Sequence, residues 1–157
     1  MKTFEAFIKE MKVKKGSPDP IEAQSLFKQS EQRLSDLIML PLSDSNASFR
    51  FESAYEVMRE ALQAFLALRG FKPYSHEAIF VFCKEHELLS MSEYMKGNRY
   101  REIRNDINYR GKTVIKSDAE EIILFVQNLT RNLKTIFDNK ISKNERLRKS
   151  VPLKKHL

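Results

Sequence analysis

The stretch A-S-F-R-F-E-S-A-Y-E-V-M-R-E-A-L-Q-A-F-L-A-L-R-G, from Ala47 to Gly70, decides the fold. Its large apolar side chains recur at the spacing of one helix face, as Phe51, Tyr55, Met58, Leu62 and Phe65. Alanines and a further leucine widen this stripe, so the helix would face neighbours on more than one side. We therefore predict a long central helix from about Ala47 to Arg69, with Gly70 as its stop.

Five further segments show helical spacing of apolar residues, at about residues 3–13, 21–40, 75–89, 92–109 and 117–137. Asp19 and Pro20 suit the N-cap and the first position of the second of these helices. The sequence S-D-A-E from Ser117 to Glu120 matches a capping box. Four glycines are too few for a β-sandwich, and no stretch alternates like a strand for long. We predict an all-α, antiparallel up-and-down bundle of five or six helices.

The chain of 157 residues has the length of one ordinary domain. We divide it into a basic amphipathic N-terminal helix (1–16), a helical bundle domain (17–141) and a basic mobile C-terminal tail (142–157). Its apolar runs fall far short of the ~20 residues of a membrane span, and the N-terminus lacks the apolar core of a signal peptide. We expect a cytoplasmic protein without contact to a membrane. Cys83 is the only cysteine, which excludes an internal disulfide and a thiolate metal cluster.

The formal net charge of +7 is concentrated at the two ends. Residues 1–16 hold five lysines against two glutamates, and residues 138–157 hold seven basic against two acidic side chains. Residues 17–137 are nearly neutral. Basic ends on a neutral body are typical of contact with nucleic acid or an acidic partner, and equally of ends that only add solubility.

A local excess of arginine lies between Arg99 and Gly111, which read R-Y-R-E-I-R-N-D-I-N-Y-R-G. On a helix, one face of this segment is an inward stripe of Tyr100, Ile103 and Ile107. The flank of the stripe carries the hydrogen-bond donors Arg101, Arg104, Asn105 and Asn108. Gly111 follows as a C′ glycine in the left-handed conformation would. Such a helix end either binds a phosphate or nucleotide, or is salt-bridged to its neighbours.

No motif in the sequence indicates a metal or cofactor site, and we expect neither. There is no glycine-rich phosphate loop and no Cys/His ligand spacing. Three carboxylates, Glu52, Glu56 and Glu60, share one face of the central helix. They could hold a divalent cation or lie in solvent. Pairing with Arg101 and Arg104 on a neighbouring helix is the interpretation we favour.

Three segments carry a family resemblance: residues 51–70, S-H-E-A-I-F-V-F at 75–82, and R-N-D-I-N-Y-R-G at 104–111. In this order they resemble the HEPN family of small α-helical domains, over about residues 20–138. The resemblance implies a bundle that dimerises and places an Arg-x(4–6)-His motif from each subunit in a shared cleft. Many HEPN proteins are metal-independent ribonucleases, often toxins paired with a small nucleotidyltransferase antitoxin.

Arg104 matches the arginine of that motif and Asn105 the polar residue that commonly follows it, but Tyr109 stands where histidine is expected. A base that takes a proton from an RNA 2′-hydroxyl needs a pKa near 7. Histidine, at about 6.5, meets this need, whereas tyrosine, at about 10, stays protonated. Tyr109 can instead donate a hydrogen bond to phosphate or stack on a base. A purely structural alternative packs Tyr109 in the core above an ion-paired Arg104.

We therefore expect a HEPN-like, dimeric module of a toxin–antitoxin pair. It would bind RNA or a nucleotide phosphate in a cleft lined by Arg101, Arg104, Asn105, Tyr109 and Arg110. One alternative is a metal-independent endoribonuclease, with Arg104 and Tyr109 as the candidate catalytic residues. Another is a non-enzymatic partner of a nucleotidyltransferase, in which Tyr109 could be the nucleotidylated residue.

Overall fold

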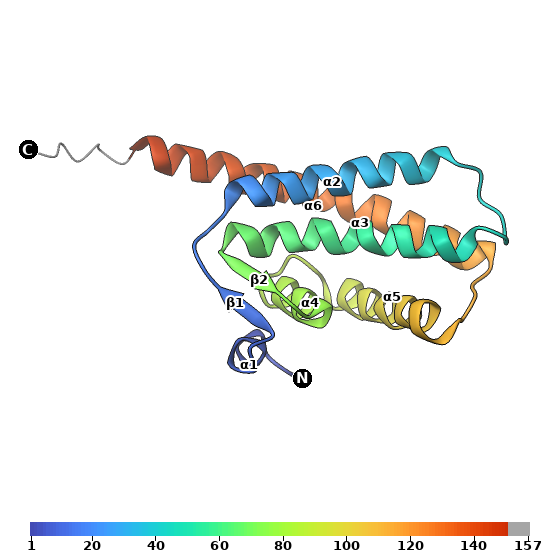
Figure 1. Cartoon of the computed structure of the whole chain (residues 1–157). Helices are drawn as coiled ribbons and strands as arrows, with labels where there is room; N and C mark the ends of the chain where they lie inside the picture. The colour runs from blue at the N-terminus through green and yellow to red at the C-terminus, as the bar shows by residue number, and fades with distance from the viewer. Residues whose placement is uncertain (151–157) are drawn as a thin grey trace, which may run out of the picture.

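A computed structural model describes residues 1–150 of the chain (Figure 1). The elements are α1 (Phe4–Lys9), β1 (Val13–Lys15), α2 (Pro20–Met39), α3 (Ala47–Leu68), β2 (Phe71–Pro73), α4 (His76–Glu85), α5 (Met91–Arg110) and α6 (Lys116–Ser150). Figure 1 shows α2, α3 and α6 lying lengthwise beside one another, with α4 and α5 along the other side of α3. The prediction of an all-α helical bundle is confirmed.

Helix α3 is the centre of the bundle, as its wide apolar stripe predicts. It contacts α2, α4, α5 and α6, and its large side chains are fully buried, among them Phe51, Tyr55, Met58 and Leu62. Helix α5 approaches α4 closely at Gly97, because a Cβ atom there would lie only 2.6 Å from Cε1 of Phe80. The glycine that weakens α5 in isolation is thus the one that lets the two helices pack.

Helix ends follow the sequence signals in most places. The Asp19 carboxylate accepts a hydrogen bond from the Glu22 N–H at 2.9 Å, with Pro20 as the first residue of α2. Gly70 and Gly111 both lie in the left-handed region, with φ of 82° and 65°. The predicted capping box at Ser117 is wrong. Helix α6 already begins at Lys116, whose N–H donates to the Asp44 carboxylate at 2.7 Å.

The N-terminal segment differs from the predicted helix over residues 3–13. Helix α1 ends at Lys9, Met11 takes a positive φ of 61°, and β1 then pairs antiparallel with β2, Lys14 opposite Lys72. Strands of three residues are too short to show alternation in the sequence. The ring of Phe4 lies 5.0 Å from that of Phe82, so the segment closes over α4 and belongs to the core.

The C-terminal segment also differs from expectation. Helix α6 continues through Ser150, so the boundary predicted at residue 141 falls inside a helix and residues 142–150 are helical where the sequence predicts a mobile tail. Lysine and arginine favour helices, and Ile141 still packs against the core. Residues 151–157 of the predicted tail lie outside the described residues. No helix within residues 1–150 is long and apolar enough to cross a membrane.

Candidate functional site

Arg104 projects from α5 onto α3 and is held there from several directions. Its Nη2 atom lies 3.7 Å from the Glu56 carboxylate, and the centre of its guanidinium lies 5.6 Å from the centre of the Tyr55 ring. The Nη1 atom donates to the Asn105 side chain at 3.3 Å. With the Asn108 amide turned so that its nitrogen faces Glu52, its oxygen accepts from Arg104 Nε at 3.1 Å. The guanidinium is therefore fixed in orientation before any ligand arrives.

Three carboxylates form the acidic row on one face of α3: Glu52, Glu56 and Glu60. This row divides its contacts between the neighbouring helices α5 and α2. Glu56 forms an ion pair with Arg59 at 2.7 Å and the longer one with Arg104, which confirms the predicted pairing for Arg104. Glu60 is turned the other way, to Arg33 of α2 at 2.7 Å. Because the three carboxylates do not converge, the cation alternative fails. Within residues 1–150 no group of three or more His, Cys, Asp or Glu side chains is placed to hold a metal.

Arg101 differs from Arg104 in having no carboxylate within 4 Å among the described residues. Its Nε atom makes one long contact, 3.5 Å, with the Asn98 side chain. The predicted pairing of Arg101 with the acidic row is therefore wrong. Its charge is left without a fixed partner beside the oriented guanidinium of Arg104.

His76 joins this cluster from α4. Its Nδ1 atom lies 3.1 Å from the hydroxyl of Tyr55, which is fully buried. Burial lowers the pKa of His76, and the nearby Arg59, Arg104 and Arg101 lower it further against the opposing effect of Glu56. Burial raises the pKa of Tyr55 well above its usual value. The pair is thus a neutral imidazole and a protonated phenol near neutral pH.

Tyr109 and Arg110 lie apart from these contacts. The Tyr109 side chain is 78% exposed, so the alternative that packs it in the core is wrong. The Arg110 guanidinium is exposed and lies 3.6 Å from Asp106 on its own helix. Of the five predicted binding residues, the structure brings Arg101, Arg104 and Asn105 to the face of α3 and leaves the other two at the exposed end of α5.

Tyr55, Arg59 and His76 complete the cluster and were not predicted. Tyr55 belongs to the apolar stripe of α3, where a core role is the default, and no local spacing relates it to His76, 21 residues later. Only the packing of α4 and α5 against α3 brings them together.

The His76 environment predicts a stability that falls with acidification. The folded protein keeps His76 neutral, whereas the unfolded chain takes up the proton at about pH 6.5. Stability is therefore complete above that pH and is lost as the pH falls below it, by up to about 1.4 kcal/mol per pH unit for one proton. Urea unfolding at pH 7.5 and 5.5 measures the loss, and His76→Asn should reduce it.

His86 is the second histidine that should contribute to this pH dependence, because burial lowers its pKa as it lowers that of His76. The double variant His76→Asn/His86→Asn should lose less stability on acidification than either single variant. A pH dependence of His76→Asn equal to that of the wild type would contradict the assignment.

Comparisons of the chain with protein-family models, with curated proteins and with solved structures found no match.

Proposed function

We propose that the protein is a HEPN-like, dimeric module that binds RNA or a nucleotide phosphate through Arg101 and Arg104. The observation that carries this proposal is that one guanidinium group, that of Arg104, is held in a fixed orientation, while its neighbour Arg101 has no carboxylate within 4 Å among the described residues. Arg104 is oriented by Glu56, Asn105 and Asn108, yet the one ion pair that it forms within residues 1–150 is long, at 3.7 Å. A phosphate oxygen at hydrogen-bond distance would compete well with so distant a carboxylate.

A second subunit would complete the cleft. Exposed aromatic and aliphatic side chains gather at the end of the bundle where α2 and α5 end and α3 begins: Met39, Leu40, Phe49, Tyr109 and Ile115. The loop before α6 is tied to this end, because the Val114 N–H donates to the Ser48 hydroxyl at 3.0 Å. Such an apolar surface is typical of an interface. A two-fold contact here would bring the Tyr109 and Arg110 side chains of the two subunits close to one another.

Binding should show the salt dependence of phosphate contacts. Fluorescence anisotropy with a labelled single-stranded RNA at rising salt measures it. For Arg101→Gln/Arg104→Gln we expect a salt slope smaller by about 0.7 for each lost phosphate contact, and an affinity at least about tenfold lower at low salt. Lys28→Gln/Arg131→Gln, on the exposed faces of α2 and α6, removes the same two charges as a matched control and should bind like the wild type. Absence of binding at low salt, or equal binding by the double variant, would reject the proposal.

Oligomeric state is measured separately, by light scattering of the wild type and of Phe49→Ser/Tyr109→Ser. We expect a dimer for the wild type and a monomer for the variant, because the substitutions remove exposed aromatic surface at the proposed contact. A monomeric wild type would reject the shared cleft. Phosphate binding by Arg101 and Arg104 of a single subunit would then be tested by the RNA titration alone.

One observation favours a second function, cleavage of the bound RNA. When Nδ1–H of His76 donates to the Tyr55 oxygen, the neutral ring presents an unprotonated Nε2, the base that Tyr109 cannot supply. Such a ribonuclease would lose activity in both His76→Asn and Arg104→Ala. Equal RNA degradation by the wild type and by both variants would reject it.

The exposure of Tyr109 favours the remaining partner, a nucleotidyltransferase of a toxin–antitoxin pair. In a single subunit, before any dimer contact covers it, a phenol that is 78% exposed is open to a modifying enzyme. Mass spectrometry after co-expression with a nucleotidyltransferase encoded beside this gene would reveal an added nucleotide on Tyr109. An unmodified Tyr109 would count against this partner.

A further inference from the structure

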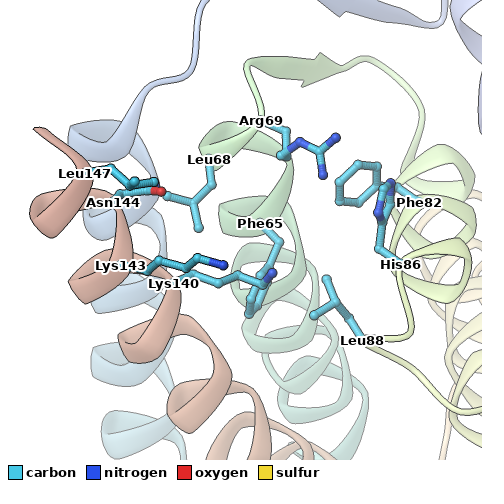
Figure 2. Close-up of a pocket in the computed structure, with 10 residues that line it drawn as sticks. All are labelled: Phe65, Leu68, Arg69, Phe82, His86, Leu88, Lys140, Lys143, Asn144 and Leu147. Atoms are coloured by element: carbon cyan, nitrogen blue, oxygen red, sulfur yellow. The ribbon is translucent and has the colours of Figure 1, made fainter. Parts of the chain in front are cut away.

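A cavity of about 230 Å³ lies at the opposite end of the bundle from Tyr109 (Figure 2). Its walls come from the last turn of α3, the end of α4 with the loop behind it, and the C-terminal turns of α6. The apolar wall is formed by Phe65, Leu68, Phe82 and Leu88, with Leu147 of α6 at the rim. Figure 2 shows Lys140 and Lys143 reaching from α6 toward Phe65, with Arg69 and His86 across the opening.

The apolar wall is part of the fixed core. Phe65 and Phe82 are each 2% exposed, and the His86 ring packs on Phe82 with centroids 4.2 Å apart. Leu88 is held because Glu87 takes a positive φ of 58° and the Leu88 N–H then donates to the Cys83 carbonyl at 2.8 Å. This part of the lining is therefore fixed in place before a ligand binds.

The ionisable side chains that line the cavity are all basic: Arg69, His86, Lys140 and Lys143. None of them has a carboxylate within 4 Å among the described residues, whereas Lys134, two turns earlier on α6, lies 3.4 Å from Glu31. Glu85, the acidic side chain that raises the pKa of His86 against the effect of burial, accepts a hydrogen bond from the Phe4 N–H at 3.2 Å. Within residues 1–150, the lining therefore presents positive charge without a carboxylate counterion.

Helix dipoles oppose an anion here, but weakly. The C-terminal ends of α3 and α4 border the cavity, and each carries about half a negative charge. Several carbonyls in their last turns are already hydrogen-bonded, among them the Ala67 carbonyl to the Asp19 N–H at 2.9 Å and the Phe82 carbonyl to the His86 N–H at 3.0 Å. Three full positive charges on Arg69, Lys140 and Lys143 outweigh these ends, so the local field favours an anion.

We propose that this cavity binds a small amphipathic anion of the medium-chain carboxylate class. The alkyl chain would lie against Phe65, Leu68 and Leu88, and the carboxylate between Lys140, Lys143 and Arg69. A cavity of about 150 Å³ holds a benzene ring, so 230 Å³ accommodates about nine or ten non-hydrogen atoms, the size of octanoate. This site is independent of the arginine cluster on α5 and of its proposed function.

Calorimetric titration of the full chain with octanoate tests the proposal. We expect saturable one-site binding, about tenfold weaker in Lys140→Gln/Lys143→Gln, because charge-assisted hydrogen bonds to the carboxylate are lost. The matched control is Arg148→Gln/Lys149→Gln, which removes the same charge from the same helix outside the cavity and should bind like the wild type. Thermal melting confirms that each variant is folded.

Two further readouts separate a site from unspecific adsorption. Octan-1-ol, equal in length but uncharged, should bind at least about tenfold more weakly than octanoate. The pKa of His86, followed by NMR, should rise when octanoate is bound, because the carboxylate stabilises the imidazolium. Equal affinity of Lys140→Gln/Lys143→Gln and wild type, equal affinity for octan-1-ol, or no saturable binding at millimolar octanoate would each overturn the proposal.

Discussion

Replacing Gly70 by alanine is expected to lower the free energy of unfolding by about 3 kcal/mol or more. Gly70 has a φ of 82°, where an alanine costs about 1–2 kcal/mol. A Cβ atom there would also meet backbone of the segment before α2, at 2.7 Å from the Ser17 carbonyl carbon and closer still to the Gly16 oxygen. Backbone yields less readily than a side chain, and overpacking of this kind adds about 1–3 kcal/mol. Urea unfolding at neutral pH measures the loss.

Gly111→Ala is the matched control. It has a similar positive φ of 65°, but a Cβ atom there meets nothing within 4 Å. Its loss should therefore be limited to the backbone cost of about 1–2 kcal/mol. Equal losses for the two variants would contradict the close approach of Gly70 to residues 16–18.

Arg50→Met is expected to cost about 2–4 kcal/mol. Arg50 is 3% exposed and has no carboxylate partner among the described residues. Instead its guanidinium donates to backbone carbonyls at the end of α2, those of Leu40 at 2.8 Å, Pro41 at 3.2 Å and Leu37. A cation at a helix C-terminus is favoured by the helix dipole, and removing it leaves several part-buried acceptors without a donor. Chemical denaturation measures the loss.

Lys28→Met, on the exposed face of α2, controls for the loss of one positive charge and should change stability by less than about 0.5 kcal/mol. Arg50→Lys keeps the charge but has fewer donors, and we expect it to fall between the wild type and Arg50→Met. If Arg50→Met lowered the free energy of unfolding no more than Lys28→Met does, Arg50 would not stabilise the end of α2.

Apolar periodicity was enough to predict the bundle, because α3 and its neighbours bury whole stripes of side chains and leave a regular trace in the sequence. Local residue types also predicted helix boundaries correctly at three positions: Asp19 caps the start of α2, and Gly70 and Gly111 follow the ends of α3 and α5. They failed at α6, where an acidic side chain 72 residues earlier, Asp44, binds the first N–H. Contacts between distant parts of the chain have no local signature.

The same reason limits what the sequence could reveal of the site. Arg104 and its pairing with Glu56 followed from helix faces, since both lie on long regular helices. Tyr55 and His76 could not be predicted, because their contact depends on how α4 sits against α3. The separation of Tyr109 from Arg104, in contrast, could have been predicted, since five residues along a helix turn a side chain about 140° away from its starting face.

The pairing of β1 with β2 bears on the order of folding. It joins residues 13–15 to residues 71–73, across the whole of α2 and α3. Closing a loop of that length costs conformational entropy. This cost falls once α2 and α3 have formed a hairpin, because the hairpin brings the two ends of the loop close together. We therefore expect the N-terminal aromatic segment to dock late. During synthesis on the ribosome, this N-terminal segment would remain exposed until the chain beyond residue 73 had emerged.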